Sequence, residues 1–90
     1  MYVPMKDILT HASENNYACI AACGVDLEMV RGLIAAADKK KAPLIIIMGG
    51  MQMARMATPA LMIPLIKTLA EATPSPIAAC LDHGRDYAKV

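Results

Sequence analysis

The chain has 90 residues, of which 57% are apolar, and nine Lys and Arg against eight Asp and Glu leave a net charge of +1. So small a charge excludes a strongly basic surface of the kind that binds nucleic acid or anionic membranes. Since no apolar stretch reaches the ~18–20 residues that span a bilayer, no membrane association is expected.

The N-terminal residues and the cysteines bear on the compartment. Residues 1–7 lack the charged start and the long apolar stretch of a signal peptide. The three cysteines are an odd number and contain no CxxC pair, so a disulfide framework is not expected. We therefore expect a cytoplasmic protein with reduced thiols.

The chain begins with a predicted helix and a predicted strand. Ile8, Leu9 and Ala12 form an apolar stripe at helical spacing, which predicts a short helix over residues 5–15. The small apolar residues that follow predict a strand over residues 17–23, although alanine has a low strand propensity.

A second helix and a second strand are predicted next. Asp26 is a favourable N-cap, and Lys39–Lys41 suit a helix carboxyl end, where the helix dipole favours cations. The apolar residues between them recur at helical spacing: Leu27, Val30, Leu33, Ile34 and Ala37. The continuous apolar run over residues 44–48 is typical of a parallel strand buried on both faces, and Gly49 and Gly50 mark its turn.

A third helix and a third strand complete the pattern. The Thr-Pro pair at residues 58–59 can open a helix that continues to about residue 72. Pro64 leaves two alternatives, a later start of this helix or a kink within it. Residues 73–76 predict a rigid connection, and residues 77–81 predict the strand.

The alternation of helices and strands indicates the fold class. The three predicted strands begin about thirty residues apart, which is the length of one βα unit. Such a pattern predicts an α/β fold with a parallel sheet and right-handed crossovers. Because the carboxyl ends of parallel strands meet at one edge, where α/β folds bind ligands, we expect a functional site at that edge.

An adjacent carboxylate and imidazole end the third predicted strand. Asp82 can serve as a general acid or base, and His83 can bind a metal ion. The alternatives are an N-cap role for Asp82 and a hydrogen-bonded surface or core position for His83. Neighbouring side chains on a strand point in different directions, so the two share a site only if the strand ends in a loop there.

The residues around this pair resemble a known family. Residues 81–84, LDHG, resemble the third-strand signature of class II, zinc-dependent ketose-bisphosphate aldolases, which include the fructose-bisphosphate and tagatose-bisphosphate enzymes. Residues 16–18 resemble the start of the first strand of that family, residues 26–30 its next helix start, and residues 42–46 its second strand. The resemblance extends over nearly all of the chain.

The resemblance implies a fold, a reaction and two site residues. The implied fold is the N-terminal part of a (β/α)8 TIM barrel, here a short helix followed by three strands with two connecting helices. The implied reaction is reversible aldol cleavage of a phosphorylated ketose to dihydroxyacetone phosphate and an aldehyde, with zinc as Lewis acid. Asp82 would be the catalytic acid/base acting on the C4 hydroxyl, and His83 one of three zinc-ligating histidines.

Four residues depart from the pattern of that family: Cys23, Ile47, Gly49 and Cys80. They leave open whether the ketose is of the fructose, the tagatose or a less usual type. A complete barrel takes ~250 residues, and the resemblance implies that the other zinc ligands follow the third strand. We therefore expect residues 1–90 to be a single incomplete domain that is inactive alone and depends on the rest of the barrel or forms homo-oligomers.

Two other functions stay open at this point. A catalytically inactive barrel fragment would self-associate through open sheet edges. Thioethers select Cu(I), so Met51, Met53 and Met56, with Met48 nearby, could bind copper, although methionines more often fill a core or cover an interface. His11 is expected to be a solvated residue of the first helix, away from His83.

Overall fold

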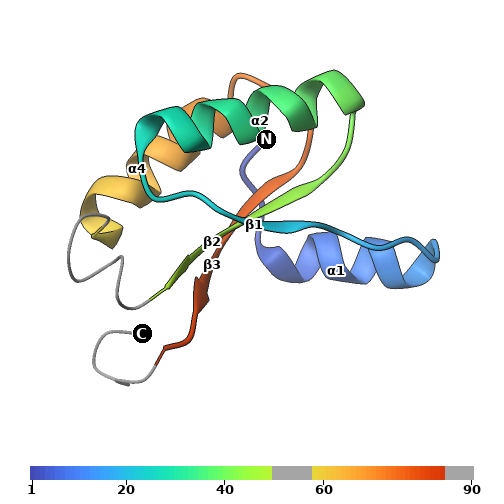
Figure 1. Cartoon of the computed structure of the whole chain (residues 1–90). Coiled ribbons are helices and arrows are strands. Elements are labelled where there is room, and N and C mark those ends of the chain that lie inside the picture. Colours follow the sequence, from blue (N-terminus) through green and yellow to red (C-terminus); the bar gives the residue numbers. More distant parts are fainter. Residues whose placement is uncertain (50–57, 85–90) are drawn as a thin grey trace.

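The structure is a computed structural model that describes residues 1–49 and 58–84, and these residues form one three-stranded sheet flanked by helices (Figure 1). In chain order the described elements are α1 (Met5–Glu14), β1 (Ala21–Cys23), α2 (Leu27–Lys40), β2 (Leu44–Gly49), α4 (Pro59–Ala70) and β3 (Ile77–Asp82). None of the helices in these ranges is long and apolar enough to cross a membrane.

The sheet is parallel throughout, as the alternation of elements predicts. Its strand order is β1-β2-β3, with Ala22 opposite Ile46 and Ile46 opposite Ala79. Helices α2 and α4 cover one face of the sheet, and α1 lies against the other face (Figure 1). All three strands therefore direct their carboxyl ends to the same edge.

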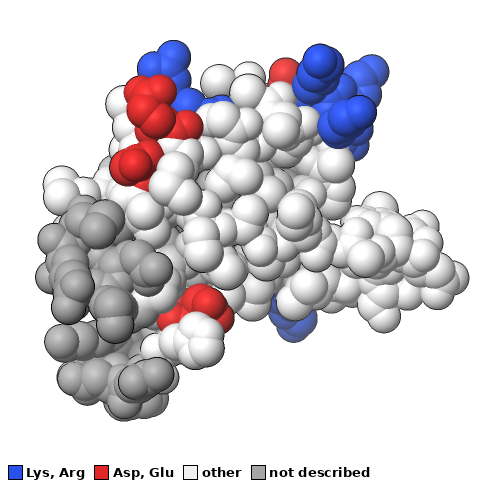
Figure 2. Space-filling model, in the orientation of Figure 1, with Lys and Arg blue, Asp and Glu red and all other residues white. Residues whose placement is uncertain are grey.

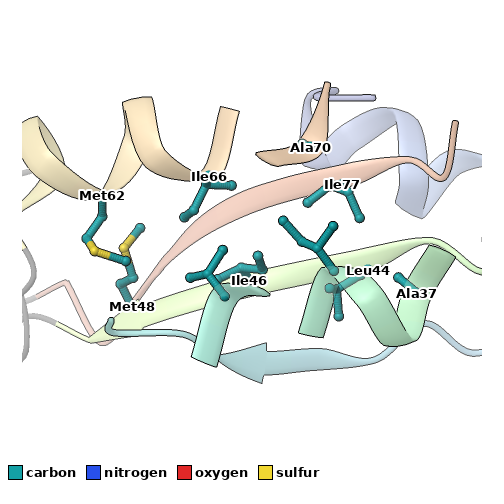
Figure 3. Close-up of a cluster of buried hydrophobic side chains, with 10 residues drawn as sticks. Ala37, Leu44, Ile46, Met48, Met62, Ile66, Ala70 and Ile77 are labelled. Carbon is teal, nitrogen blue, oxygen red and sulfur yellow. The ribbon is translucent and has the colours of Figure 1, made fainter. Parts of the chain in front are cut away.

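The main core lies between the sheet and the pair α2 and α4. Val30, Ile46, Ile66 and Ile77 are fully buried there, at 0% exposure. In Figure 3 the side chains of Met48 and Met62 point toward one another, and Ile46, Ile66 and Ile77 fill the space beside them. Because Phe and Trp are absent from the chain, branched aliphatic residues and methionines fill this layer.

The second core is small and lies under α1. Ile8 of α1 packs with Ile45 and Ala78, and all three are buried. Farther toward the carboxyl ends of the strands, the same face is less covered, since Ile47 and Cys80 are only half-buried. Helix α1 thus closes the amino-terminal half of this face and leaves its carboxyl-terminal half accessible among the described residues.

Several element boundaries differ from the sequence-based expectations. β1 covers only Ala21–Cys23 rather than residues 17–23, because this edge strand pairs with β2 alone over these residues. The second strand is expected to be buried along residues 44–48, and in the structure all of these residues are buried except Ile47, which is half-buried. The predicted apolar stripes are only partly buried, since Leu9 is 46% and Leu27 is 44% exposed.

The third helix resolves the alternatives that Pro64 left open. α4 begins at Pro59 with Thr58 as its N-cap residue, and Pro64 lies inside it, so the helix does not start late. Its buried residues are Met62, Ile66 and Ala70, and it ends there, two residues before the expected end. The early start places Met62 in the core, where it meets Met48.

The predicted caps of α2 are confirmed. The side chain of Asp26 accepts a hydrogen bond from the backbone N–H of Met29 at 2.8 Å, and Lys41 closes the other end with a left-handed backbone (φ 52). Figure 2 shows Lys and Arg side chains gathered over the far end of α2, where Lys39 and Lys40 form its last turn. This position fits a helix-end role for the cations.

Candidate active site at the carboxyl end of β3

Asp82 and His83 lie at the point where β3 ends. Asp82 is the last residue of the strand, and His83 takes a left-handed backbone conformation (φ 55), which breaks the alternation of side chains. As a result, the Nε2 atom of His83 lies 3.6 Å from the Oδ2 atom of Asp82. The structure thus brings together the two candidate residues that a continuous strand would separate.

The neighbours of Asp82 follow from the strand register. Gly49 of β2 lies directly opposite Asp82, so no side chain of the adjacent strand stands beside the carboxylate. Strand alternation places Asp82 on the same face as Ala78 and Cys80, which is the face that α1 covers at its other end. The carboxylate therefore belongs to the accessible half of that face.

Both candidate side chains are open to solvent. The side chain of His83 is 75% exposed and that of Asp82 is 44% exposed. The separation of 3.6 Å is longer than a hydrogen bond, so each polar atom keeps its capacity to bind another group. An accessible carboxylate beside an imidazole can hold and move protons or bind a cation.

The donor set fits part of a zinc site. Imidazole nitrogen is a common zinc ligand, and catalytic zinc sites have about three protein ligands. Within residues 1–49 and 58–84, no three His, Cys, Asp or Glu side chains come together to hold a metal ion. His83 is thus one suitable ligand, and the others would have to come from outside the described residues.

Two cysteines lie in the layer beneath Asp82. Cys23 of β1 pairs with Ile47 of β2, and Ile47 pairs with Cys80 of β3, so the three side chains form one row across the sheet. Cys19, Cys23 and Cys80 are all free cysteines. Burial raises the pKa of the remaining thiol, Cys19, above its ordinary value of 9.0.

The other residues considered from the sequence lie elsewhere. His11 is exposed on α1, and its Nδ1 atom lies 2.8 Å from the hydroxyl of Tyr17. Met48 is buried in the core at 3% exposure, which supports a packing role for it. The rest of the proposed copper-binding segment, Met51, Met53 and Met56, lies outside the described residues.

A parallel sheet of βα units with its polar pair at the carboxyl end of a strand has the architecture of an α/β barrel. The family model of class II fructose-bisphosphate aldolase matches residues 3–90, so the chain belongs to this family. The resemblance seen in residues 81–84 is thereby confirmed.

A solved structure gives the same fold. The chain is similar to the YdjI aldolase of Escherichia coli K12, with a TM-score of 0.86 and 24% sequence identity, over 99% of this chain and 34% of that chain. It therefore spans about a third of that protein, and its fold is part of a TIM barrel, as expected. A comparison with curated proteins gave no match.

Proposed function

We propose that this chain contributes to a class II aldolase that cleaves a phosphorylated ketose reversibly, with zinc, into dihydroxyacetone phosphate and an aldehyde. The ketose would be of the fructose-bisphosphate or tagatose-bisphosphate type. The observation that carries the proposal is the match of residues 3–90 to the class II family, together with Asp82 and His83 side by side at the carboxyl end of β3. The three free thiols are compatible with a cytoplasmic enzyme.

Asp82 is the proposed acid/base. In the cleavage direction its carboxylate takes the proton of the C4 hydroxyl as the bond between C3 and C4 breaks, so that C4 becomes the aldehyde carbon. The electron pair of that bond stays on C3, next to the ketone, and C3 then takes up a proton to give dihydroxyacetone phosphate. In the condensation direction these steps reverse, and Asp82 returns its proton to the C4 oxygen. Its position supports this role because Gly49 opposite leaves room beside the carboxylate for a substrate carbon chain. A general base must lie within hydrogen-bond reach of the proton that it moves, which an accessible carboxylate permits.

His83 is the proposed metal ligand from this chain. When bound, zinc would supply a Lewis acid for the ketone oxygen of the substrate. The imidazole of His83 reaches toward solvent with 75% of its side chain exposed, so further ligands from the rest of a barrel can approach it. The nearby carboxylate of Asp82 can also orient the imidazole ring.

The identity of the ketose depends on the layer below Asp82. Cys23, Ile47 and Cys80 present two thiols and an aliphatic group to the accessible face. We propose that these departures from the family pattern adjust which aldehyde portion is accepted. Measuring cleavage of fructose and tagatose bisphosphates side by side distinguishes the two types.

The metal role of His83 is tested in the protein that contains this chain together with the rest of its barrel. Zinc content and the rate of dihydroxyacetone phosphate release are measured for the parent protein, for His83→Ala and for the matched control His11→Ala. We expect His83→Ala to lose both zinc and cleavage, because one of about three ligands is removed. His11→Ala should keep both, since His11 lies on α1 away from the strand ends.

A second candidate function is association with further polypeptide, which exposed apolar side chains favour. Ile20 beside edge strand β1 is 65% exposed, and Leu61 of α4 is 68% exposed. The open edge of β1 leaves backbone groups unpaired among the described residues, so further polypeptide could pair there and cover Ile20. The partner would be the remaining strands of the barrel or another copy of the chain. Sedimentation of residues 1–90 distinguishes these, since a stable oligomer supports self-association and a well-folded monomer contradicts it.

A further inference from the structure

His11 and Tyr17 lie together at the carboxyl end of α1. The Nδ1 atom of His11 is 2.8 Å from the hydroxyl oxygen of Tyr17, and the centroids of the two rings are 5.6 Å apart. Both side chains are exposed among the described residues. Figure 1 shows the carboxyl end of α1 on the opposite side of the molecule from the end of β3, so this pair is separate from Asp82 and His83.

The backbone at the end of α1 returns Tyr17 to the helix. Asn15 is the C-cap residue of α1, and Asn16 then takes a left-handed conformation (φ 56). The N–H of Tyr17 donates to the carbonyl oxygen of Ala12 at 3.1 Å, which is the closing hydrogen bond of a Schellman motif. The phenol ring therefore lies beside the last turn of the helix, which carries His11.

The last turn of α1 is itself held by hydrogen bonds. The carbonyl oxygen of His11 accepts one hydrogen bond from the backbone N–H of Asn15 at 3.0 Å and a second from its side-chain amide at 2.9 Å. The bond from Tyr17 to Ala12 fixes the other partner. The two side chains are thus brought together by the backbone before any third group binds, which favours a reaction between them and that group.

The short distance lets His11 act as a base toward the phenol. A neutral imidazole has one nitrogen without a proton, and a hydroxyl group can donate a hydrogen bond to that nitrogen. A hydroxyl within about 2.6–3.2 Å of a basic side chain has the arrangement that activates nucleophiles in enzymes. As the oxygen of Tyr17 forms a bond to an acyl carbon, the Nδ1 atom of His11 can take the phenolic proton.

We propose that Tyr17 and His11 form an acyl-acceptor site for activated esters, with the hydroxyl of Tyr17 as nucleophile and the imidazole of His11 as general base. The phenolic oxygen attacks the acyl carbon, and the bond from that carbon to the leaving oxygen breaks. The leaving group departs with the electron pair of that bond. The proton of Tyr17 passes to His11 and then to the leaving group, so the products are an ester of Tyr17 and a free hydroxyl compound.

Acetylation by p-nitrophenyl acetate tests the proposal in the full protein. Peptide mass spectrometry gives the rate of acetylation at Tyr17 for the parent, for His11→Gln and for His11→Ala. Glutamine can keep a hydrogen bond to the phenol but is not a base. We expect the rate to fall at least about tenfold in both variants, because general-base catalysis typically contributes about 10²–10⁴-fold. An unchanged rate in either variant would overturn the proposal.

Two controls identify the nucleophile and separate the pair from a general effect. An imidazole can itself attack an activated ester, so the initial release of p-nitrophenol is compared in the parent and in Tyr17→Phe. We expect a smaller release from Tyr17→Phe, whereas equal release would assign the attack to His11 and contradict the proposal. Acetylation of Lys6, which is exposed on α1, should be the same in every variant, and a fall there equal to that at Tyr17 would also contradict it.

Unfolding gives a test that needs no substitution. The unmodified protein is acetylated folded and in urea, and the rate at Tyr17 is divided by the rate at Lys6. We expect this ratio to fall at least about tenfold in urea, because unfolding separates the phenol from its base. A ratio that stays constant or rises on unfolding would refute activation of Tyr17 by the fold.

Discussion

The Nε2 atom of His83 lies 3.6 Å from the Oδ2 atom of Asp82, although the two residues are consecutive in the chain. Consecutive strand residues point to opposite faces, so this approach depends on the end of β3 at Asp82 and on the left-handed backbone of His83 (φ 55). The backbone turn thereby places a carboxylate and an imidazole on the same side.

The left-handed backbone of His83 predicts how substitutions there affect stability. Asn tolerates this conformation, so His83→Asn should change the free energy of unfolding by less than about 0.5 kcal/mol. Val is β-branched and disfavours it, so His83→Val should lower the free energy of unfolding by about 1–2 kcal/mol. Urea denaturation of both variants measures the difference, and equal stability would contradict the assigned backbone.

Gly24 lies where α2 passes close over the sheet. A Cβ atom at this position would be 2.8 Å from Cγ2 of Ile46 and 3.1 Å from Cγ2 of Val30, both in fully buried side chains. Gly24→Ala should therefore lower the free energy of unfolding by about 1–3 kcal/mol through overpacking.

The matched control for Gly24 lies within α2 itself. A Cβ atom at Gly32 would meet no atom within 4 Å, and Ala is the better helix former, so Gly32→Ala should raise the free energy of unfolding by about 0.5–1 kcal/mol. Thermal or urea unfolding of the two variants should thus give shifts of opposite sign. Shifts of the same sign would show that Gly24 does not lie as close to Ile46 of β2 and Val30 of α2 as described.

The N-caps of two helices should differ in strength. Asp26 accepts a hydrogen bond from the N–H of Met29, whereas the side chain of Thr58 makes no capping hydrogen bond to α4. Asp26→Ala should lower the free energy of unfolding by about 1 kcal/mol, and Thr58→Ala by less than about 0.5 kcal/mol. Denaturant midpoints test this order, and a larger loss in Thr58→Ala would contradict it.

The partial burial of Cys19 predicts that its thiol reacts slowly. Its raised pKa and partial burial should make it react with a thiol reagent more slowly than the exposed Cys23. Since the folded pKa lies above the ordinary 9.0, the unfolded chain ionises first as the pH rises.

The stabilising contribution of Cys19 is therefore complete below this ordinary pKa and is lost as the pH rises toward the folded pKa. Comparing the parent with Cys19→Ala from about pH 8 to about pH 10 should show their stability difference shrinking. A constant difference would contradict the shift.

The sequence predicted much of the fold because local signals agreed with the tertiary arrangement. The β-branched run of β2, the N-cap Asp26 and the helical spacing around Val30 all lead to elements that the structure contains. The ends of strands and the burial of individual residues were harder to predict, because they depend on the neighbouring elements. β1 is short because it lies at the sheet edge, and Leu9 and Leu27 are exposed because α1 and α2 have no facing element over them among the described residues.

The sequence indicates which residues form the candidate site, but not how their side chains are arranged. The sequence identifies Asp82 and His83, but period-two alternation separates their side chains. The end of β3 at Asp82 and the left-handed backbone of His83 bring them together, and the adjacent Gly84 was a weak sign of such a turn.

The proposed aldolase activity depends on the carboxylate of Asp82 as the group that moves the proton. Its most direct test is the cleavage rate of Asp82→Asn in the complete barrel at matched zinc content, with Asp7→Asn on exposed α1 as control. We expect Asp82→Asn to lose at least about a hundredfold in rate while keeping zinc, and Asp7→Asn to match the parent. A rate for Asp82→Asn equal to that of the parent would contradict the assignment.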